Sequence, residues 1–80
     1  MTYVYILKST RFPARTYVGR TANLAERFHQ QNAGRSPHTA PFRPWQLVVA
    51  VWFENGRRAT AFERYLKTGS GRAFAKRHFL

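Results

Sequence analysis

The sequence contains no cysteine and no aspartate, and its only acidic residues are the three glutamates Glu26, Glu54 and Glu63. The absence of cysteine excludes thiolate catalysis, cysteine-bound zinc and disulfide bonds. The absence of aspartate excludes a Ser-His-Asp triad and any site built on an aspartate pair, which covers most two-metal phosphoryl-transfer centres. Because a disulfide-free domain of this size suits a reducing compartment, we expect a cytoplasmic protein.

Long apolar runs are also missing. No stretch approaches the roughly 20 apolar residues that a membrane span needs. The N-terminal segment MTYVYILK has no basic residue before its apolar part, so we expect no signal peptide. A length of 80 residues predicts a single domain over residues 1–80. Its 44% of hydrophobic residues are enough for a packed core, although a chain this short buries only a thin one.

Positive charge dominates the composition. Fourteen Lys and Arg residues, eleven of them Arg, give a formal net charge of +11. Because the guanidinium group binds phosphate through two parallel hydrogen bonds, nucleic acid is the first partner that we expect. An anionic membrane surface is the alternative. It would need a basic amphipathic helix with an unbroken apolar face, and residues 72–80 are too short to provide one.

Three segments have the composition of strands. Residues 3–7 and 16–18 are β-branched and aromatic, and their closeness in sequence predicts an antiparallel hairpin. Residues 46–53, QLVVAVWF, form the most apolar stretch, and we expect them to be the central strand. Of the two tryptophans, Trp52 lies inside this stretch, so Trp45 is the better candidate for exposure.

Helical signals fill the rest of the chain. Thr21 or Asn23 can cap a helix that begins near residue 22, and Gly34 is expected to end it in a left-handed conformation. Further helices are expected over 58–67 and 72–78.

The segments between these elements are expected to be loops and turns. They are the proline-containing loop 35–44, an Asn55-Gly56 turn and a break at 69–71. The resulting order, β-β-α-β-α-α, predicts an α/β (α+β) fold: a small three-stranded antiparallel sheet flanked by helices.

Four ordered motifs together resemble the GIY-YIG nuclease superfamily. They are Tyr3-Val4-Tyr5, Tyr17-Val18-Gly19, the helix segment Asn23-Leu24-Ala25-Glu26-Arg27 and the glutamate segment Phe62-Glu63-Arg64-Tyr65-Leu66-Lys67. The segments 32–39 and 69–74 are similar to those of small stand-alone bacterial members, so the resemblance covers essentially the whole chain. The resemblance implies hydrolysis of a DNA phosphodiester bond that depends on Mg²⁺, with Mn²⁺ as a possible substitute.

Glu63 is the metal ligand that this resemblance implies. On a helix that buries Ala59, Phe62 and Leu66, Glu63 lies at the border of the apolar stripe. One carboxylate with several water molecules is a normal Mg²⁺ shell, because this ion keeps water and takes substrate phosphate. A surface ion pair with Arg64, Lys67 or another arginine is the alternative reading of the same position.

Three further residues are catalytic by resemblance. Arg27, at the edge of the buried face of the first helix, would hold the scissile phosphate; a solvated helix arginine is the alternative. Tyr5 and Tyr17 would supply active-site hydroxyl groups, with Tyr17 favoured as the general base. A tyrosine base near neutral pH needs its pKa lowered from about 10, which nearby Arg and metal charge would do. We expect these groups and Glu63 to share one wall of the sheet.

A second set of residues is predicted to contact DNA: Arg20, Gln31, Asn32, Arg35, His38, Lys67 and Arg72. Gln31 departs from the family pattern, because many relatives have His there. His29 cannot replace it, since it lies about 200° from Arg27 around the helix and Gln31 only about 40°. Glutamine cannot transfer a proton at neutral pH, so a catalytically impaired nucleic-acid-binding domain remains the alternative function. The sequence leaves open whether the DNA is branched, single-stranded or of another form.

Overall fold

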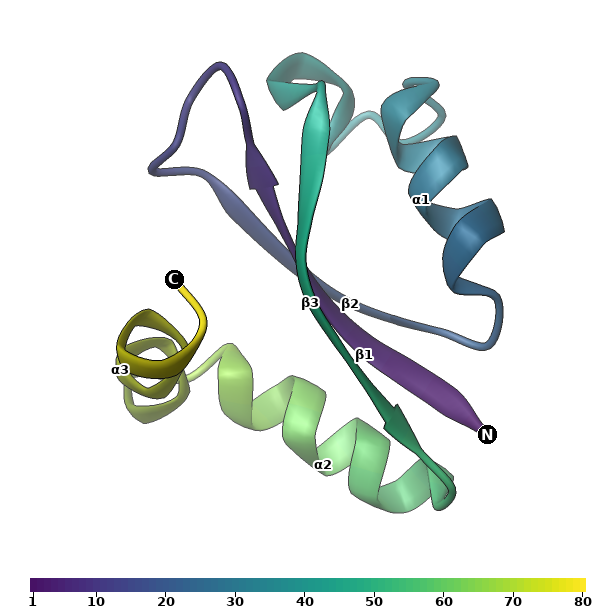
Figure 1. Ribbon diagram of the computed structural model, residues 1–80, viewed down its shortest axis with the longest axis vertical. Coiled ribbons are helices and arrows are strands. Elements are labelled where there is room, and N and C mark those ends of the chain that lie inside the picture. The colour runs from purple at the N-terminus through teal and green to yellow at the C-terminus, as the bar shows by residue number, and fades with distance from the viewer.

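The computed structural model describes all residues, 1–80, and confirms the predicted α+β fold class. Its elements in chain order are β1 (Thr2–Ser9), β2 (Thr16–Thr21), α1 (Leu24–Asn32), the 3-10 turn η1 (Ala40–Phe42), β3 (Trp45–Phe53), α2 (Gly56–Leu66) and α3 (Gly69–His78). Figure 1 shows α1 and η1 on one side of the sheet and α2 and α3 on the other. None of the helices has the length and apolarity that a membrane span needs.

The sheet has the strand order β2-β1-β3, and both pairings are antiparallel. The predicted hairpin of β1 with β2 is confirmed, but the prediction that 46–53 is the central strand is wrong, because β3 lies at an edge. Four consecutive residues of β1, Val4 to Leu7, are at most 1% exposed. Alternate side chains of a strand point to opposite faces, so this run marks the strand that is covered on both sides. Apolar character alone does not distinguish it from β3.

The edge position of β3 also reverses the expectation for the tryptophans. Trp52 is 51% exposed, whereas Trp45 at the start of β3 is only 4% exposed. The indole of Trp45 donates a hydrogen bond to the Thr39 carbonyl oxygen, 3.0 Å away. The side chain of Asn32 brackets the backbone of Trp45, accepting from its N–H at 2.5 Å and donating to its carbonyl at 3.1 Å. Trp45 therefore ties η1 and the end of α1 to the sheet.

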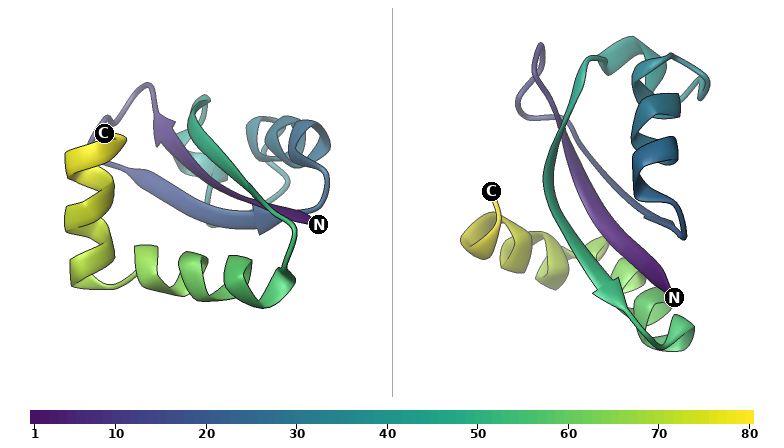
Figure 2. Two further views of the ribbon diagram at one scale, coloured as in Figure 1. Left: turned by 60° about the horizontal axis from the view of Figure 1, so that its bottom comes forward. Right: turned by 45° about the vertical axis from the view of Figure 1, so that its right-hand side comes forward.

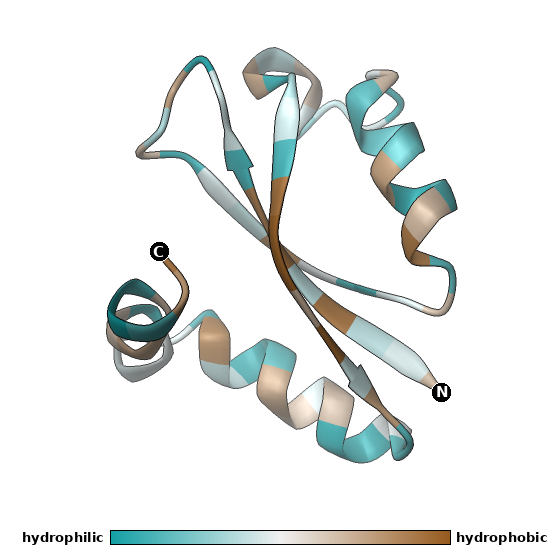
Figure 3. Ribbon diagram, viewed as in Figure 1, coloured by the Kyte–Doolittle hydropathy of each residue, from teal (hydrophilic) through white to brown (hydrophobic).

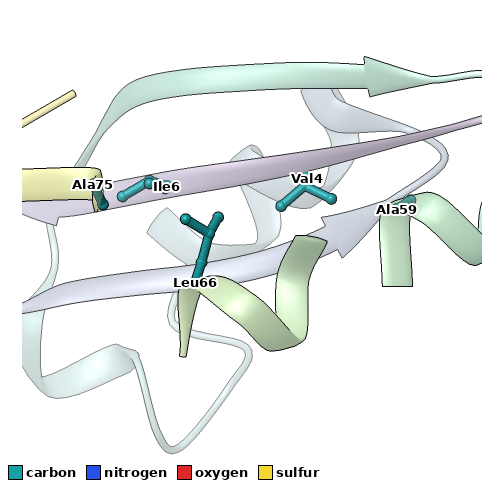
Figure 4. Packing of buried hydrophobic residues seen from close by; sticks show 5 residues of the cluster. All are labelled: Val4, Ile6, Ala59, Leu66 and Ala75. Carbon is teal, nitrogen blue, oxygen red and sulfur yellow. The ribbon is translucent and has the colours of Figure 1, made fainter. Parts of the chain in front are cut away.

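Two hydrophobic clusters close the two faces of the sheet. The cluster under α2 and α3, shown in Figure 4, consists of Val4, Ile6, Ala59, Leu66 and Ala75. The cluster under α1 and η1 consists of Tyr5, Leu7 and Trp45, with partly buried aromatic and aliphatic neighbours. In Figure 3 the most hydrophobic backbone runs along the middle of β1 and β3, between these two layers. Because successive side chains of β1 point to opposite faces of the sheet, this strand contributes residues to both clusters.

Each helix begins at a side-chain cap. Asn23, Asn55 and Thr68 accept hydrogen bonds from backbone N–H groups in the first turns of α1, α2 and α3. Of the two caps considered for the first helix, Asn23 is the one used. The expected Asn55-Gly56 turn is the start of α2.

The end of the first helix agrees with its prediction, whereas the start of α3 does not. Gly34 has a φ of +79°, as predicted for the residue that ends α1. The expected break at 69–71 is wrong, since α3 already begins at Gly69. A Cβ atom on Gly71 would overlap the Tyr65 carbonyl, so this glycine allows α2 and α3 to meet closely.

Candidate active site

Tyr5 reaches toward the exposed edge of the sheet across Gly19. The two residues are paired in the β1–β2 ladder. A Cβ atom at position 19 would lie 2.6 Å from Cζ of Tyr5 and 2.8 Å from Cε2 of Tyr17. Real Cβ contacts are never this short, so the position must be glycine for the tyrosines to lie as they do. The two tyrosine rings are 6.2 Å apart between centroids.

The hydroxyl oxygen of Tyr5 accepts a long hydrogen bond, 3.5 Å, from Nε2 of Gln31. The hydroxyl of Thr39 in turn donates to Oε1 of Gln31. Thr39 and Gln31 are 2% and 3% exposed. If the amide were turned round, the buried Thr39 hydroxyl would donate to nothing, which costs free energy. Thr39 therefore sets the amide so that Gln31 donates to Tyr5, and the proton of Tyr5 points elsewhere.

The environment raises the pKa of Tyr5 above its ordinary value. Burial is the main cause, because the charged phenolate loses its hydration. The Gln31 hydrogen bond acts in the opposite direction, and the neighbouring Tyr17 raises the pKa further. The charge of Arg27 lowers it and that of Glu63 raises it. Tyr5 is therefore a protonated hydrogen-bond donor at neutral pH, and the other three predicted catalytic residues all influence its pKa.

Glu63 lies between two basic side chains that come from different elements. Its Oε1 is 3.5 Å from Nε of Arg20 on β2, and its Oε2 is 3.3 Å from Nζ of Lys67 at the end of α2. The Glu63 side chain is 17% exposed, and those of Arg20 and Lys67 are 40% and 55% exposed. Arg20 also donates to the hydroxyl of Thr60. The ion pair that the sequence offered as an alternative is thus present, and its two cations are the more exposed partners.

The expectation that the catalytic groups share one wall of the sheet is wrong. Tyr5 and Tyr17 belong to the layer under α1, whereas Glu63 is on α2 under the opposite face. Both layers adjoin the edge strand β2, which carries Tyr17 and contacts Glu63 through Arg20, and which lies between the levels of α1 and α2 in the left view of Figure 2. Arg27 is exposed on α1. An edge strand with no further strand beside it allows groups from both layers to approach one another.

The residues predicted to contact DNA divide into exposed and enclosed groups. Arg20, Arg35, His38, Lys67 and Arg72 are exposed. Gln31 is buried, so it acts on Tyr5 and has no direct access to a phosphate. The amide of Asn32 is engaged with the Trp45 backbone. For the exposed residues, the DNA contact stays a prediction.

Sequence reasoning missed Thr39, the residue that follows His38. The Ser-Pro-His-Thr segment drew attention to its histidine, although the threonine is the inward-pointing member. Reasoning also missed a hollow of about 690 Å³ beside Arg20 at the start of α2, to which Arg57 and Thr60 contribute. A buried hydroxyl and a hollow depend on contacts between distant segments, so no local signal in the sequence reveals them.

The donor set is compatible with one hard cation held by a single carboxylate. No group of three or more His, Asp or Glu side chains converges anywhere in the chain. Mg²⁺ does not need such a group, because it retains water and takes phosphate oxygen as ligands. The two cations next to Glu63 would have to turn away from the carboxylate, and their exposure allows this. Glu63 is the residue that could hold the ion.

Two comparisons with known proteins show the family of this chain. The model of the GIY-YIG catalytic domain matches residues 1–77. A UPF0213 protein of Clostridium perfringens (strain 13 / Type A) is 40% identical over 68 residues, which cover 84% of this chain and 71% of the relative. The matched region includes every predicted catalytic residue. The chain therefore belongs to the GIY-YIG family, whose catalytic domains are typically nucleases.

Proposed function

We propose that this protein is a metal-dependent endonuclease that hydrolyses DNA phosphodiester bonds. The observation that carries the proposal is that three predicted catalytic residues gather along β2: the rings of Tyr5 and Tyr17 are 6.2 Å apart, and Glu63 contacts the same strand through its arginine. A phosphate at this edge of the sheet would meet hydroxyl, guanidinium and carboxylate groups together. The net charge of +11 favours a polyanionic substrate.

Arg27 would bind the scissile phosphate. Its guanidinium group is exposed and makes no ion pair with any glutamate, so its donors are free for substrate oxygens. A donor aimed at charge that develops in the transition state typically contributes about 2.7–4 kcal/mol. Arg20 would join it on substrate binding, when its contact with Glu63 opens.

The two tyrosines would have different roles. Tyr5 keeps its proton at neutral pH and already accepts from Gln31, so its own O–H is available to donate to a phosphate oxygen or to water. Tyr5 cannot pass its own proton to Gln31, because Gln31 presents an N–H group, which is a donor, to the Tyr5 hydroxyl. Tyr17 is partly exposed and has no side-chain hydrogen bond to another residue. We therefore assign the activation of the attacking water to Tyr17.

Glu63 would hold the divalent ion, and Mg²⁺ bound there supplies Lewis-acid stabilisation of the charge on the phosphate and leaving oxygens. The carboxylate must exchange its contacts with Arg20 and Lys67 for the ion. Both side chains could then turn to substrate phosphates, which keeps the charges in the site paired. The metal ion would thus replace Arg20 and Lys67 as the partner of Glu63, and the substrate phosphates would replace Glu63 as the partner of the two cations.

The decisive experiment compares cleavage by the wild type and by Glu63→Gln. A labelled DNA panel, with single-stranded, nicked, flapped and four-way forms, is incubated with Mg²⁺ or Mn²⁺. We expect Glu63→Gln to lower the cleavage rate on the order of 10²- to 10³-fold, because several kcal/mol of charge stabilisation is lost. Glu54→Gln removes an equivalent charge from an exposed loop and is the matched control. Cleavage by Glu63→Gln at the wild-type rate would refute the metal assignment.

A second readout tests the metal without cleavage. Mn²⁺ should raise the melting temperature of the wild type and of Glu54→Gln, and should leave that of Glu63→Gln unchanged, because an ion that binds only the folded state stabilises it. Equal shifts in all three proteins would place the ion elsewhere.

A nucleic-acid-binding domain without catalysis is the second candidate function. The observation in its favour is Gln31, which presents an N–H to Tyr5 and cannot transfer a proton at neutral pH. A wild type that binds DNA but cleaves no substrate with either metal would support this function. Activity in Gln31→His would then identify the glutamine as the cause of the loss.

A further inference from the structure

A groove of about 940 Å³ lies between the β1–β2 hairpin and α3, and we call it the basic groove. Its walls come from the loop between β1 and β2, from the two strands themselves, from the end of α2 and from α3. Figure 1 shows the C-terminal end of the chain on the same side of the molecule as the hairpin loop. The groove is distinct from the hollow beside Arg20 at the start of α2.

The charge of the basic groove is of one sign. Five cationic side chains line it: Lys8, Arg15, Lys67, Arg72 and Lys76. No acidic side chain is part of its lining. Confined like charges make a local field that attracts anions, so the surface is complementary to a chain of phosphates. Arg15 is further held in place by its contact with the Phe42 ring, 4.6 Å from the ring centroid.

The basic groove also offers apolar surface that phosphates alone would not use. Leu80, which is 47% exposed, and Val18, which is partly exposed, are part of its lining. A duplex keeps its bases paired inside and presents its phosphates and sugars to a non-specific protein. The bases of an unpaired strand are free to pack on apolar side chains while its backbone follows the cations. The combination favours one unpaired strand over a duplex.

The basic groove is continuous with the candidate active site. Lys67 lines the groove, and its Nζ is 3.3 Å from Oε2 of Glu63. Tyr17 is also part of the lining, and its ring neighbours that of Tyr5. A strand with a phosphate at Glu63 would therefore enter the groove with its next nucleotides.

We propose that the basic groove binds the unpaired nucleic-acid strand that extends from one side of the scissile phosphate. The proposal rests on the proposed function, since it takes Glu63 as the place of cleavage. Binding in the groove is nevertheless measurable in a protein that does not cleave. The failure of one proposal can therefore be told from the failure of the other.

The test uses the full chain carrying Glu63→Gln and a fluorescent oligothymidylate of roughly 12 nucleotides, within the usual range of site sizes. Arg72→Gln/Lys76→Gln removes two groove charges from α3. Arg64→Gln/Arg77→Gln removes two exposed charges that do not line the groove and is the matched control. Anisotropy titrations over a range of salt concentrations give the affinity and its salt slope. All four positions are exposed, so we expect every variant to fold, which a thermal scan checks.

We expect the groove variant to bind roughly 10- to 30-fold more weakly at about 0.1 M salt, and its salt slope to fall by about 1.4, because two phosphate contacts are lost. The control variant should lose less than about threefold. Equal losses of affinity in the two variants would refute binding in the basic groove, whether or not the wild type cleaves DNA. If the groove variant binds more weakly than the control but the wild type cleaves no DNA, binding in the basic groove would be supported and the proposed nuclease function refuted.

Two further ligands test the unpaired strand. An abasic strand with the same number of phosphates should bind at least about fivefold more weakly, because stacking of a base on an aromatic side chain such as Tyr17 is worth about 1–3 kcal/mol. A blunt duplex of the same length should compete poorly and should be insensitive to the groove substitutions. Equal binding of the abasic strand or of the duplex would refute an unpaired occupant.

Discussion

The two faces of the sheet are closed by different chemistry. The face under α2 and α3 is closed by apolar side chains alone. The face under α1 and η1 combines an apolar cluster with three buried polar side chains: Ser9, Gln31 and Thr39. Every buried side-chain polar atom in the molecule has a hydrogen-bond partner. The α1 face therefore carries a satisfied polar network that the opposite face lacks.

The difference in buried polar groups suggests that one face mainly stabilises the fold and the other mainly positions side chains. Apolar packing is non-directional and proportional to the area buried, so the α2/α3 face serves stability. Hydrogen bonds are directional, and a buried one that loses a partner costs free energy, so the α1 face holds its side chains in one arrangement. Tyr5 is the member of this network that reaches the candidate site. Stability and positioning can therefore be disturbed separately.

The largest effect on stability is expected for Leu66→Ala on the α2/α3 face. Leu66 is 2% exposed within the apolar cluster, and its truncation should lower the free energy of unfolding by about 2–5 kcal/mol. The whole domain is expected to have only roughly 4–12 kcal/mol, so much of its stability would be lost. Urea or thermal unfolding measures the change.

Leu47→Ala on the edge strand is the control for this prediction. Leu47 is 38% exposed, so its truncation should cost less than about 1 kcal/mol. Equal losses at the two leucines would contradict the assignment of stability to the α2/α3 face.

A smaller effect is expected from the polar network of the other face. Gln31→Leu leaves the Thr39 and Tyr5 hydroxyls without their partner, and Thr39→Val leaves Oε1 of Gln31 without its donor. Each should cost about 1–3 kcal/mol. The double variant should cost less than the sum, because removing both polar partners avoids an unpaired group. Unfolding measurements on the four proteins give the coupling.

The same cycle separates positioning from stability. Both single variants should lower cleavage per folded molecule, because the Tyr5 hydroxyl is no longer oriented. Unchanged cleavage in a folded Thr39→Val, or additive costs in the double variant, would contradict the role given to Thr39.

The smallest effect is expected in alkaline solution. Because burial raises the pKa of Tyr5, the folded chain holds this proton to a higher pH than the unfolded chain, whose tyrosines titrate near about 10. The contribution of Tyr5 is complete below about pH 10 and is lost as the pH rises through its folded-state pKa. The stability of Tyr5→Phe should therefore fall less steeply with pH above about 10, with a difference of at most about 1.4 kcal/mol per pH unit.

Tyr65→Phe provides the comparison for the alkaline measurement. Tyr65 is 39% exposed, and its hydroxyl lacks the buried partner that Tyr5 has. Parallel curves for the wild type and Tyr5→Phe would show that the phenol of Tyr5 is not shielded from water.

The fold was largely predictable because its signals are local. Strand composition, an antiparallel hairpin and a helix cap at Asn23 can each be recognised within a few residues. The strand order was not predictable from hydropathy. A strand at the edge and a strand at the centre can have equal apolar content, and only the partners on both sides of β1 distinguish them.

For the candidate site, the sequence motifs predicted individual residues but not the contacts between them. The motifs predicted Tyr5, Tyr17, Arg27 and Glu63, and the charges of Arg27 and Glu63 both influence the pKa of Tyr5. They did not identify Thr39 or the contact of Arg20 with Glu63, whereas Lys67 was already offered as a partner of Glu63. Thr39 and Gln31 belong to different segments, and Arg20 and Glu63 are far apart in the sequence, so no helical spacing rule links either pair.

The order of elements, the positive charge and the family membership were determined by the sequence itself, because each depends on residue type and local spacing. Tertiary structure decided which strand is central, which face of the sheet is polar inside, and that the carboxylate and the phenols come from opposite layers of the sheet. These outcomes depend on which distant surfaces are buried against one another. Burial is a property of the whole folded chain and is not contained in any one segment.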